Sequence, residues 1–183
     1  MGVAFILLAK EDPMAAERAG TGAKSFMEQM EPLRELRVWR FALYYFFVFG
    51  AFVALALWLP HFLIGVYGLD IKTAGILAAL YTIPASPFRI LGGWMSDRFG
   101  ARRVMYWTFS ASVACTFLLS YPPTEYVVQG IDGDIRFTLE MSLPVFVALI
   151  FIVGFFMSLG KAAVYKHIPV YYPMHVGAVG GVV

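Results

Sequence analysis

The sequence predicts an all-α fold, a polytopic bundle of membrane-spanning helices with about four complete spans and two partial ones. Of the 183 residues, 60% are hydrophobic and 14% are charged, whereas soluble domains average about 45–50% apolar and about 25% charged residues. The apolar residues are also clustered: residues 41–69 contain no acid or base except His61, and residues 73–88 contain none. Runs of this length fit helices that cross about 30 Å of hydrocarbon with roughly 20 residues.

The chain divides into an apolar start, a charged linker and a bundle. Residues 1–10, MGVAFILLAK, are apolar but too short to cross a bilayer, so we expect the end of a preceding transmembrane helix. Residues 11–39 mix charges and are rich in Ala, Gly and Glu, which is typical of a cytoplasmic linker, and Ser25 and Glu28 have capping-box spacing. Residues 40–183 then form a partial transmembrane bundle. Its expected spans are residues 41–63, 73–96, 104–121 and 141–164, with another beginning at residue 176.

The distribution of Lys and Arg predicts the orientation of these spans, because basic residues in short loops are retained in the cytoplasm. Six basic residues precede the first span, three lie between the second and third, and two end the fourth. The opposite loops contain only Lys72 and Arg136. The second and third spans therefore meet in the cytoplasm. The outer segment YVVQGIDGDIRFTLE alternates apolar and polar residues around Asp132-Gly133, which indicates a β-hairpin.

The sequence offers little catalytic chemistry. No His cluster, acid pair or nucleophile–base arrangement is evident, so we expect no enzyme, no cofactor and no metal. The single Cys115 lies in the third span, which leaves no partner for a disulfide or a thiol metal site within the chain.

Arg89 stands out because it is a charged residue inside the second span. Asp97 marks the cytoplasmic edge eight residues later, so the Arg89 backbone lies about 12 Å inside that edge. Helical side chains lean toward the N-terminus, which directs the guanidinium toward mid-membrane. A charge at that depth costs at least about 2.5–3.5 kcal/mol and normally faces a bundle interior or an aqueous cavity. We predict that Arg89 lines a central pathway; the alternative is a structural arginine paired to a neighbouring helix.

An arginine in such a cavity suits an oxyanion, because its planar fork of donors can form two parallel hydrogen bonds. No acid lies within the four expected spans, so we expect an anionic substrate to neutralise the charge of Arg89. Pro84 and Pro87 make the helix irregular just before Arg89. Broken helices at mid-depth often mark transporter sites, although prolines also kink purely structural helices.

The stretch GGWMSDRFGARR, residues 92–103, resembles the signature loop of the major facilitator superfamily. That pattern runs Gly, three residues, Asp-Arg, any residue, Gly and then basic residues. Its positions are occupied here by Gly93, Asp97, Arg98, Gly100, Arg102 and Arg103, with Ala101 where the family often has another base. Physically, Gly93 would permit close helix approach, Gly100 a tight turn, and Asp97 a pairing with bases or a helix N-terminus. Such a charged latch would stabilise one state of a rocking transporter; simple positive-inside anchoring is the alternative.

Three further features are similar to the nitrate/nitrite porters of that superfamily. Tyr45 and Phe49 lie one helical turn apart, like the aromatic pair that flanks the anion in those porters, and Arg89 matches their binding-site arginine. The segment from Lys166 resembles the start of their glycine-rich nitrate signature helix. Its small-residue positions are occupied by Gly177, Gly180 and Gly181. Aromatic walls and an arginine fork suit a flat, weakly hydrated anion, but aromatic residues at helical spacing are also common in simple packing.

Lys161 leaves two interpretations open. It could line the inner vestibule or influence proton coupling, but snorkelling to the cytoplasmic interface is the favoured interpretation of a lysine near the end of the fourth span.

The resemblance implies a secondary active transporter of nitrate, nitrite or both, working by alternating access as a nitrate/nitrite antiporter or a nitrate/proton symporter. It places the chain in the C-terminal half of a twelve-helix protein, as a fragment without its N-terminal half. We expect an integral protein of the bacterial cytoplasmic membrane, surrounded by lipid and binding no nucleic acid. The alternatives are a major facilitator transporter of another small anion and a small membrane-anchoring subunit.

Overall fold

A computed structural model describes residues 27, 30–121, 124–130 and 133–183. The first expected segment, residues 1–10, and the proposed capping box of Ser25 and Glu28 lie outside the described residues. In chain order the elements are η1 (Glu31–Arg34), α4 (Leu36–Tyr45), η2 (Phe46–Ala51), α5 (Phe52–Tyr67), α6 (Ile71–Thr82), α7 (Ala85–Phe99), α8 (Ala101–Leu119), β1 (Thr124–Gly130), β2 (Gly133–Leu139), α9 (Leu143–Tyr171) and α10 (Val176–Val182).

The first apolar run forms one continuous helical segment from α4 through η2 to α5. The segment η2 is a π-helix, a wider turn inserted between two α-helices. The segment ends at Gly68, whose φ of 64° is the left-handed conformation that commonly terminates helices. Asp70 then caps α6, because its side chain accepts hydrogen bonds from the backbone N–H groups of Lys72 and Thr73. The Thr73 hydroxyl also donates to Asp70, which lowers the pKa of this carboxyl.

The second apolar run is interrupted, as its prolines predict. The helix α6 ends at Thr82 and α7 begins at Ala85, so the break immediately precedes the turn that carries Arg89. Pro84 and Pro87 have no N–H group to donate to the carbonyls four residues earlier, which leaves the backbone there without two helical hydrogen bonds. The predicted irregularity is confirmed.

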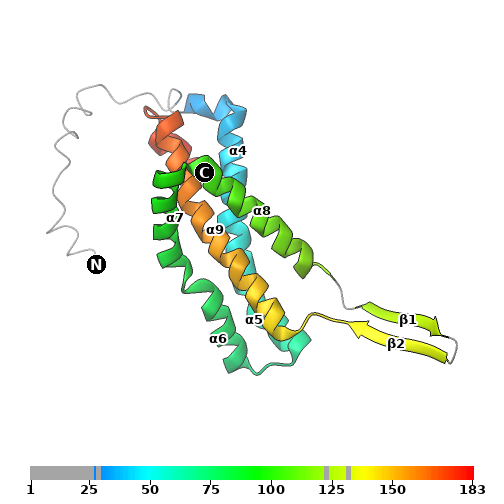
Figure 1. Ribbon diagram of the computed structural model, residues 1–183. Coiled ribbons are helices and arrows are strands. Elements are labelled where there is room, and N and C mark those ends of the chain that lie inside the picture. The colour runs from blue at the N-terminus through cyan, green and yellow to red at the C-terminus, as the bar shows by residue number, and fades with distance from the viewer. Residues whose placement is uncertain (1–26, 28–29, 122–123, 131–132) are drawn as a thin grey trace.

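The expected hairpin is also present. Strands β1 and β2 pair antiparallel from Thr124↔Leu139 to Gly130↔Gly133. Tyr126 and Phe137 are opposite each other and stack with ring centroids 5.2 Å apart. Figure 1 shows this hairpin projecting from the end of the bundle opposite the α7–α8 turn.

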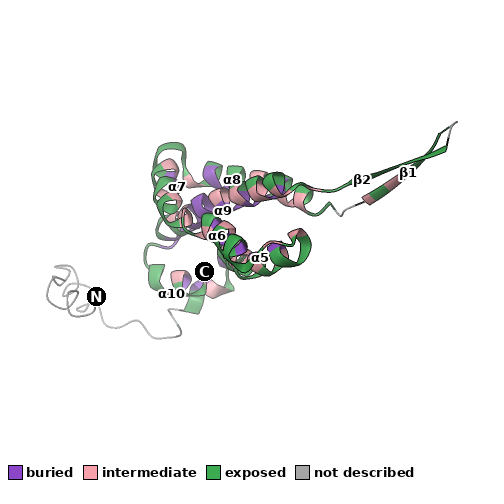
Figure 2. Ribbon diagram, turned by 90° about the horizontal axis from the view of Figure 1, so that it is seen from below, coloured by how far each residue is buried: buried purple, intermediate pink, exposed green. Residues whose placement is uncertain are grey.

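The long helix α9 is the centre of the bundle. It contacts every other helix from α4 to α10, and Figure 1 shows it between α7 and α8 with α4 and α5 behind. Figure 2 shows buried residues concentrated along α9, whereas the hairpin is exposed. Two buried apolar clusters share this helix, one around Leu159 and Val164 and the other around Val153 and Met157.

Three helical segments in the described part of the chain are long and apolar enough to cross a membrane: Leu36–Tyr67, Ile71–Phe99 and Leu143–Tyr171. They contain the expected spans 41–63 and 73–96 and all but the first two residues of the expected span 141–164. The helix α8 covers most of the remaining expected span, residues 104–121, but it is shorter and its first turn carries Arg102 and Arg103. A fourth span therefore stays a prediction.

The close approach of α7 to α9 occurs at Gly92, not at Gly93. A Cβ atom at Gly92 would lie 2.6 Å from the Leu159 Cα and 2.7 Å from its carbonyl oxygen. A Cβ atom at Gly93 would meet no described atom within 4 Å. The face of α7 that meets α9 contains Gly92 and Ser96, which are both buried. The expectation that Gly93 permits the close approach of a helix stays a prediction.

Gly92→Ala should therefore destabilise the chain, because the new methyl group would push against backbone atoms that cannot rotate away. Overpacking of this kind typically costs about 1–3 kcal/mol. Thermal unfolding of the detergent-solubilised chain, followed by helical circular dichroism, would measure the loss. Gly93→Ala is the matched control and should be neutral or slightly stabilising, since alanine favours a helix interior. Equal destabilisation by both substitutions would contradict this assignment of the contact.

The ends of α4, α7 and α9 meet at one end of the bundle, which the charge distribution predicts to be cytoplasmic. Beyond α9, the Tyr172 hydroxyl donates a hydrogen bond to the Glu35 carboxylate just before α4, at 2.7 Å. Burial, followed by this contact with Glu35, raises the pKa of Tyr172 to about 12. The phenol therefore remains a donor across the physiological pH range and ties the start of α4 to the end of α9.

Candidate anion site

The structure brings Arg89 together with residues of two other helices. Arg89 is exposed on α7, and its guanidinium interacts electrostatically with the Tyr45 hydroxyl on α4 and the Lys161 ammonium on α9. Within the described part of the chain, no carboxylate pairs with Arg89. The two described groups that interact with it are thus a phenol and a second cation, and neither neutralises its charge.

Tyr45 and Phe49 form an aromatic wall beside this arginine. Their rings stack with centroids 5.3 Å apart, as expected for residues one helical turn apart. Tyr165 of α9 meets the Tyr45 ring edge-on at a centroid distance of 4.9 Å. Phe49 lies in the π-helix η2, and such turns are frequent at functional sites because they redirect side chains.

Lys161 is buried inside the bundle and does not reach the interface. Only 5% of its surface is exposed. Its Nζ lies 3.2 Å from the ring centroid of Phe52 and 5.5 Å from that of Phe49. The snorkelling interpretation is therefore wrong, because ten residues of α9 follow Lys161 and aromatic rings enclose its ammonium. The interpretation that places Lys161 beside the substrate pathway stays a prediction.

The three polar members of the site lie at similar positions along their helices. Arg89 and Lys161 are each ten residues before the ends of α7 and α9, and Tyr45 is nine residues after the start of α4. At 1.5 Å per residue, each is roughly 14–15 Å from the predicted cytoplasmic end. Two cations this deep, with no carboxylate paired to them among the described residues, are costly, and a bound anion would lower that cost.

A groove of about 570 Å³ borders the aromatic wall. It is lined by residues of α4, η2 and α10, including Tyr45, Phe49 and Gly50. Arg89 and Lys161 do not line this groove. Arg89 interacts with Tyr45, which does line it, and with the buried Lys161.

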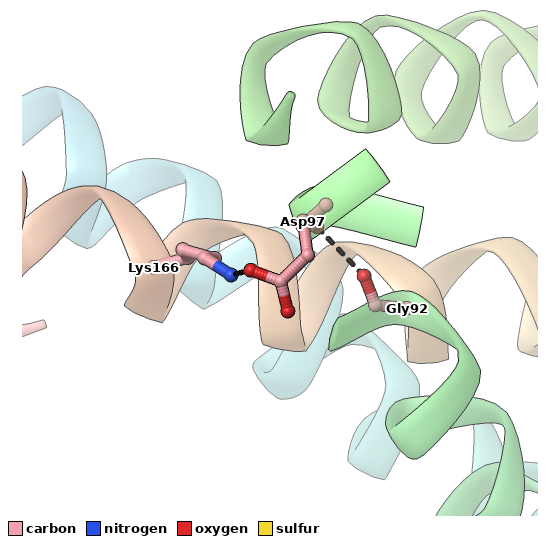
Figure 3. A network of polar contacts seen from close by, with 4 residues as sticks. Gly92, Asp97 and Lys166 are labelled. Carbon is pink, nitrogen blue, oxygen red and sulfur yellow. Dashed lines mark hydrogen bonds and ion pairs between the residues drawn. The ribbon is translucent and has the colours of Figure 1, made fainter. Parts of the chain in front are cut away.

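The signature loop carries an ion pair between two helices. Asp97 at the end of α7 pairs with Lys166 of α9, and Figure 3 shows the two side chains directed toward each other. Close by, the Ser96 hydroxyl donates to the Gly92 carbonyl at 2.7 Å. The expectation that Asp97 pairs with a base is confirmed, and the base is on α9.

The remaining residues of this loop take different positions. Gly100 alone joins α7 to α8, with a φ of 88° that L-residues with side chains rarely adopt, so the predicted tight turn is confirmed. Arg98 lies over the Trp94 and Phe99 rings at 5.7 and 5.9 Å. Arg102 donates hydrogen bonds to the Tyr106 hydroxyl at 3.1 and 3.2 Å. Arg103 is exposed, and its latch role stays a prediction.

The three signature glycines lie in the short helix α10. A Cβ atom at Gly177, Gly180 or Gly181 would meet no described atom within 4 Å, so no described helix packs closely against them. Their role in the pathway stays a prediction.

Sequence reasoning missed three parts of this site. Tyr165 is four residues after Lys161 and therefore on the same face of α9, a spacing that could have identified it. Phe52 follows Phe49 on the next helical turn, but aromatic residues are too frequent in this chain for that to be specific. Nothing in the sequence distinguishes η2 from an ordinary α-helix. In the described ranges, no three His, Cys, Asp or Glu residues are grouped as a metal site would require.

Comparison with known proteins identifies the family of the chain. The Major Facilitator Superfamily profile matches residues 1–183. The chain belongs to the major facilitator superfamily. Members of this superfamily are helical membrane transporters, so the chain is part of an integral membrane protein of a non-enzymatic class.

Its relatives within the superfamily are nitrate and nitrite transporters. The chain is 48% identical over 174 residues to the probable nitrate/nitrite antiporter NarK1 of Thermus thermophilus, which covers 93% of the chain and 39% of that relative. It is 28% identical to the nitrite extrusion protein of Bacillus subtilis over 80% of the chain and 32% of that relative. The chain thus spans about two fifths of the first of these proteins and a third of the second. The comparison with solved structures gave no significant match.

Proposed function

We propose that the whole protein transports nitrate, nitrite or both across the bacterial cytoplasmic membrane by alternating access. The observation that carries this proposal is the meeting of Arg89 and Lys161 beside an aromatic wall, where no described carboxylate pairs with either cation. A planar anion between the guanidinium and the Tyr45 hydroxyl would supply the counter-charge. The printed functions of the relatives support the same substrate class.

The Asp97–Lys166 pair supports a role for the signature loop as a latch. The pair joins the ends of α7 and α9 at the predicted cytoplasmic side. When the two halves of a transporter rock about a midplane site, contacts at one end stabilise one state over the other. The same proposed latch includes the other residues of the signature loop: Gly93, Arg98, Gly100, Arg102 and Arg103.

Exchange is one coupling mechanism that fits the site. Arg89 is permanently charged, so it favours a state with an anion always bound while the transporter reorients. The exchange of one nitrate for one nitrite across the membrane satisfies that requirement without moving protons.

Lys161 favours proton coupling as a second candidate. Unlike arginine, a lysine can lose its proton when it is buried away from anions. Lys161 faces Arg89 of α7, and Tyr165, one turn later on α9, packs against the Tyr45 ring. A proton bound with nitrate and released after it would carry both in the same direction.

A counterflow experiment tests the transport function. A full-length transporter can be assembled by substituting this chain for the matching segment of the Thermus thermophilus relative. Proteoliposomes containing this assembled transporter and loaded with nitrite should accumulate labelled nitrate, and those loaded with sulfate should not. The unmodified relative provides the active control. Absence of counterflow in the assembled, correctly inserted protein would contradict the proposal.

Tyr45→Phe should weaken nitrate transport moderately, because it removes the hydroxyl donor and retains the stacked ring. A neutral hydrogen bond contributes about 0.5–1.5 kcal/mol, so the apparent nitrate affinity should fall by roughly two- to tenfold. Counterflow at a series of nitrate concentrations would measure the change. Tyr126→Phe in the hairpin removes a hydroxyl outside the proposed site and should leave the affinity unchanged. Equal effects of the two substitutions would remove Tyr45 from the site.

A further inference from the structure

A second pocket, separate from the candidate anion site, lies at the predicted cytoplasmic end of the bundle. Its volume is about 320 Å³ and its walls come from α4, α8 and α9. Three arginines line it, Arg37, Arg40 and Arg102, together with aromatic side chains and no described carboxylate. It shares no residue with the site around Arg89 and Lys161.

The wall from α4 is a single stripe of the helix. Arg37, Arg40, Phe41 and Tyr44 have the i, i+3, i+4, i+7 spacing that places residues on one face. The arginines are nearest to the predicted cytoplasmic end, and the aromatic rings lie deeper. From Arg37 to Tyr44 the stripe extends roughly 10 Å along the helix.

The wall from α8 repeats this arrangement. Arg102, Met105, Tyr106 and Phe109 have the same spacing, again with the cation in the first turn. The two stripes meet at the deeper level, where Tyr44 and Phe109 approach with ring centroids 5.2 Å apart.

The third wall comes from the end of α9 and is aromatic. His167 stacks on Phe41 at a centroid distance of 5.4 Å. The Arg37 guanidinium carbon lies 5.1 Å from the centre of the Tyr171 ring. The pocket is therefore cationic at its mouth and apolar beneath. An anionic phospholipid at the membrane surface has the complementary arrangement, with a negative headgroup above apolar acyl chains.

We propose that this pocket binds an anionic phospholipid, with its phosphate at Arg37, Arg40 and Arg102 and an acyl chain along the aromatic stripes. Basic pockets between transmembrane helices on the cytoplasmic side suit such headgroups. Charge complementarity selects the occupant: three exposed arginines line the mouth, and the described lining supplies no carboxylate to neutralise them. The apolar depth distinguishes a lipid from a soluble phosphate.

Native mass spectrometry of the chain in detergent tests this proposal. The chain would be mixed with dioleoyl phosphatidylglycerol or with dioleoyl phosphatidylcholine, which differ in net charge but have the same acyl chains. We expect preferential binding of phosphatidylglycerol. The triple variant Arg37→Gln, Arg40→Gln and Arg102→Gln should reduce that preference at least about tenfold, since each cation near the membrane surface adds to the attraction of anionic lipids.

A matched variant separates the pocket from general charge. Arg34→Gln, Lys72→Gln and Arg136→Gln together also remove three exposed positive charges, but none of them lines the pocket. This control should change the preference less than about twofold, and circular dichroism should show that both variants remain folded. Equal losses in the two variants would overturn the proposal, as would no loss in either. Displacement of the lipid by an equal concentration of inorganic phosphate would assign the pocket to soluble anions and overturn it too.

Discussion

Arg89→Lys is expected to reduce nitrate transport by roughly a hundredfold in the assembled transporter. Lysine retains the positive charge but loses the planar fork that can hold two oxygens of a flat anion. Each hydrogen bond to a charged group contributes about 1.5–3 kcal/mol, so the loss of one corresponds to a factor of about ten to more than a hundred. Nitrate counterflow in proteoliposomes would measure the change, and it should exceed the effect of Tyr45→Phe.

Arg136→Lys is the control for this substitution, because Arg136 is exposed on β2 at the opposite end of the bundle. It should leave counterflow unchanged. The amount of inserted protein must be equal for both variants, so that a folding defect is not mistaken for a loss of binding. Normal counterflow by inserted Arg89→Lys protein would show that Arg89 does not contact the anion.

Much of the bundle could be predicted from the sequence because the membrane imposes simple constraints. Apolar runs of sufficient length marked the helices, Pro84 and Pro87 marked the break, and Asp132-Gly133 marked the hairpin. The helices, the break and the hairpin depend on residues that are close together in the chain, so a single sequence is enough to predict them. The length of α9 was underestimated because its last turns carry Lys166 and His167, polar residues that a hydropathy pattern places outside the helix.

The candidate site was only partly predictable because it depends on which helix faces meet. Arg89 could be identified from its depth in the span, and the Tyr45–Phe49 pair from its resemblance to the aromatic pair of the nitrate/nitrite porters. The structure places Arg89 beside Tyr45. The close packing of Gly92 against α9 was not identified, because a shift of one residue turns a helix face by about 100° and the sequence does not show which face meets α9. Lys161 was misplaced because its depth depends on how far α9 continues, which the apolar pattern alone did not reveal.

The packing of Lys161 supports the last prediction, which concerns coupling. Its ammonium is enclosed by Phe52 and Phe49 and faces the like charge of Arg89. A bound anion favours the charged form of this lysine over its neutral form. Nitrate binding should therefore be accompanied by proton uptake at Lys161, and nitrate affinity should decrease as the pH rises through the titration of this residue.

Lys161→Met should abolish nitrate uptake driven by an inward proton gradient, while nitrate/nitrite exchange remains measurable. The thioether fills a similar volume but carries no proton, so the pH dependence of nitrate affinity should disappear. Lys161→Arg should also lose proton-driven uptake, because its charge is fixed, but it should bind nitrate better than the Met variant does. Uptake in proteoliposomes with and without a pH gradient would separate these outcomes, with Lys72→Met at the start of α6 as the exposed control. Proton-driven uptake that persists in Lys161→Met would assign the coupling to another group and leave exchange through Arg89 as the mechanism that this site supports.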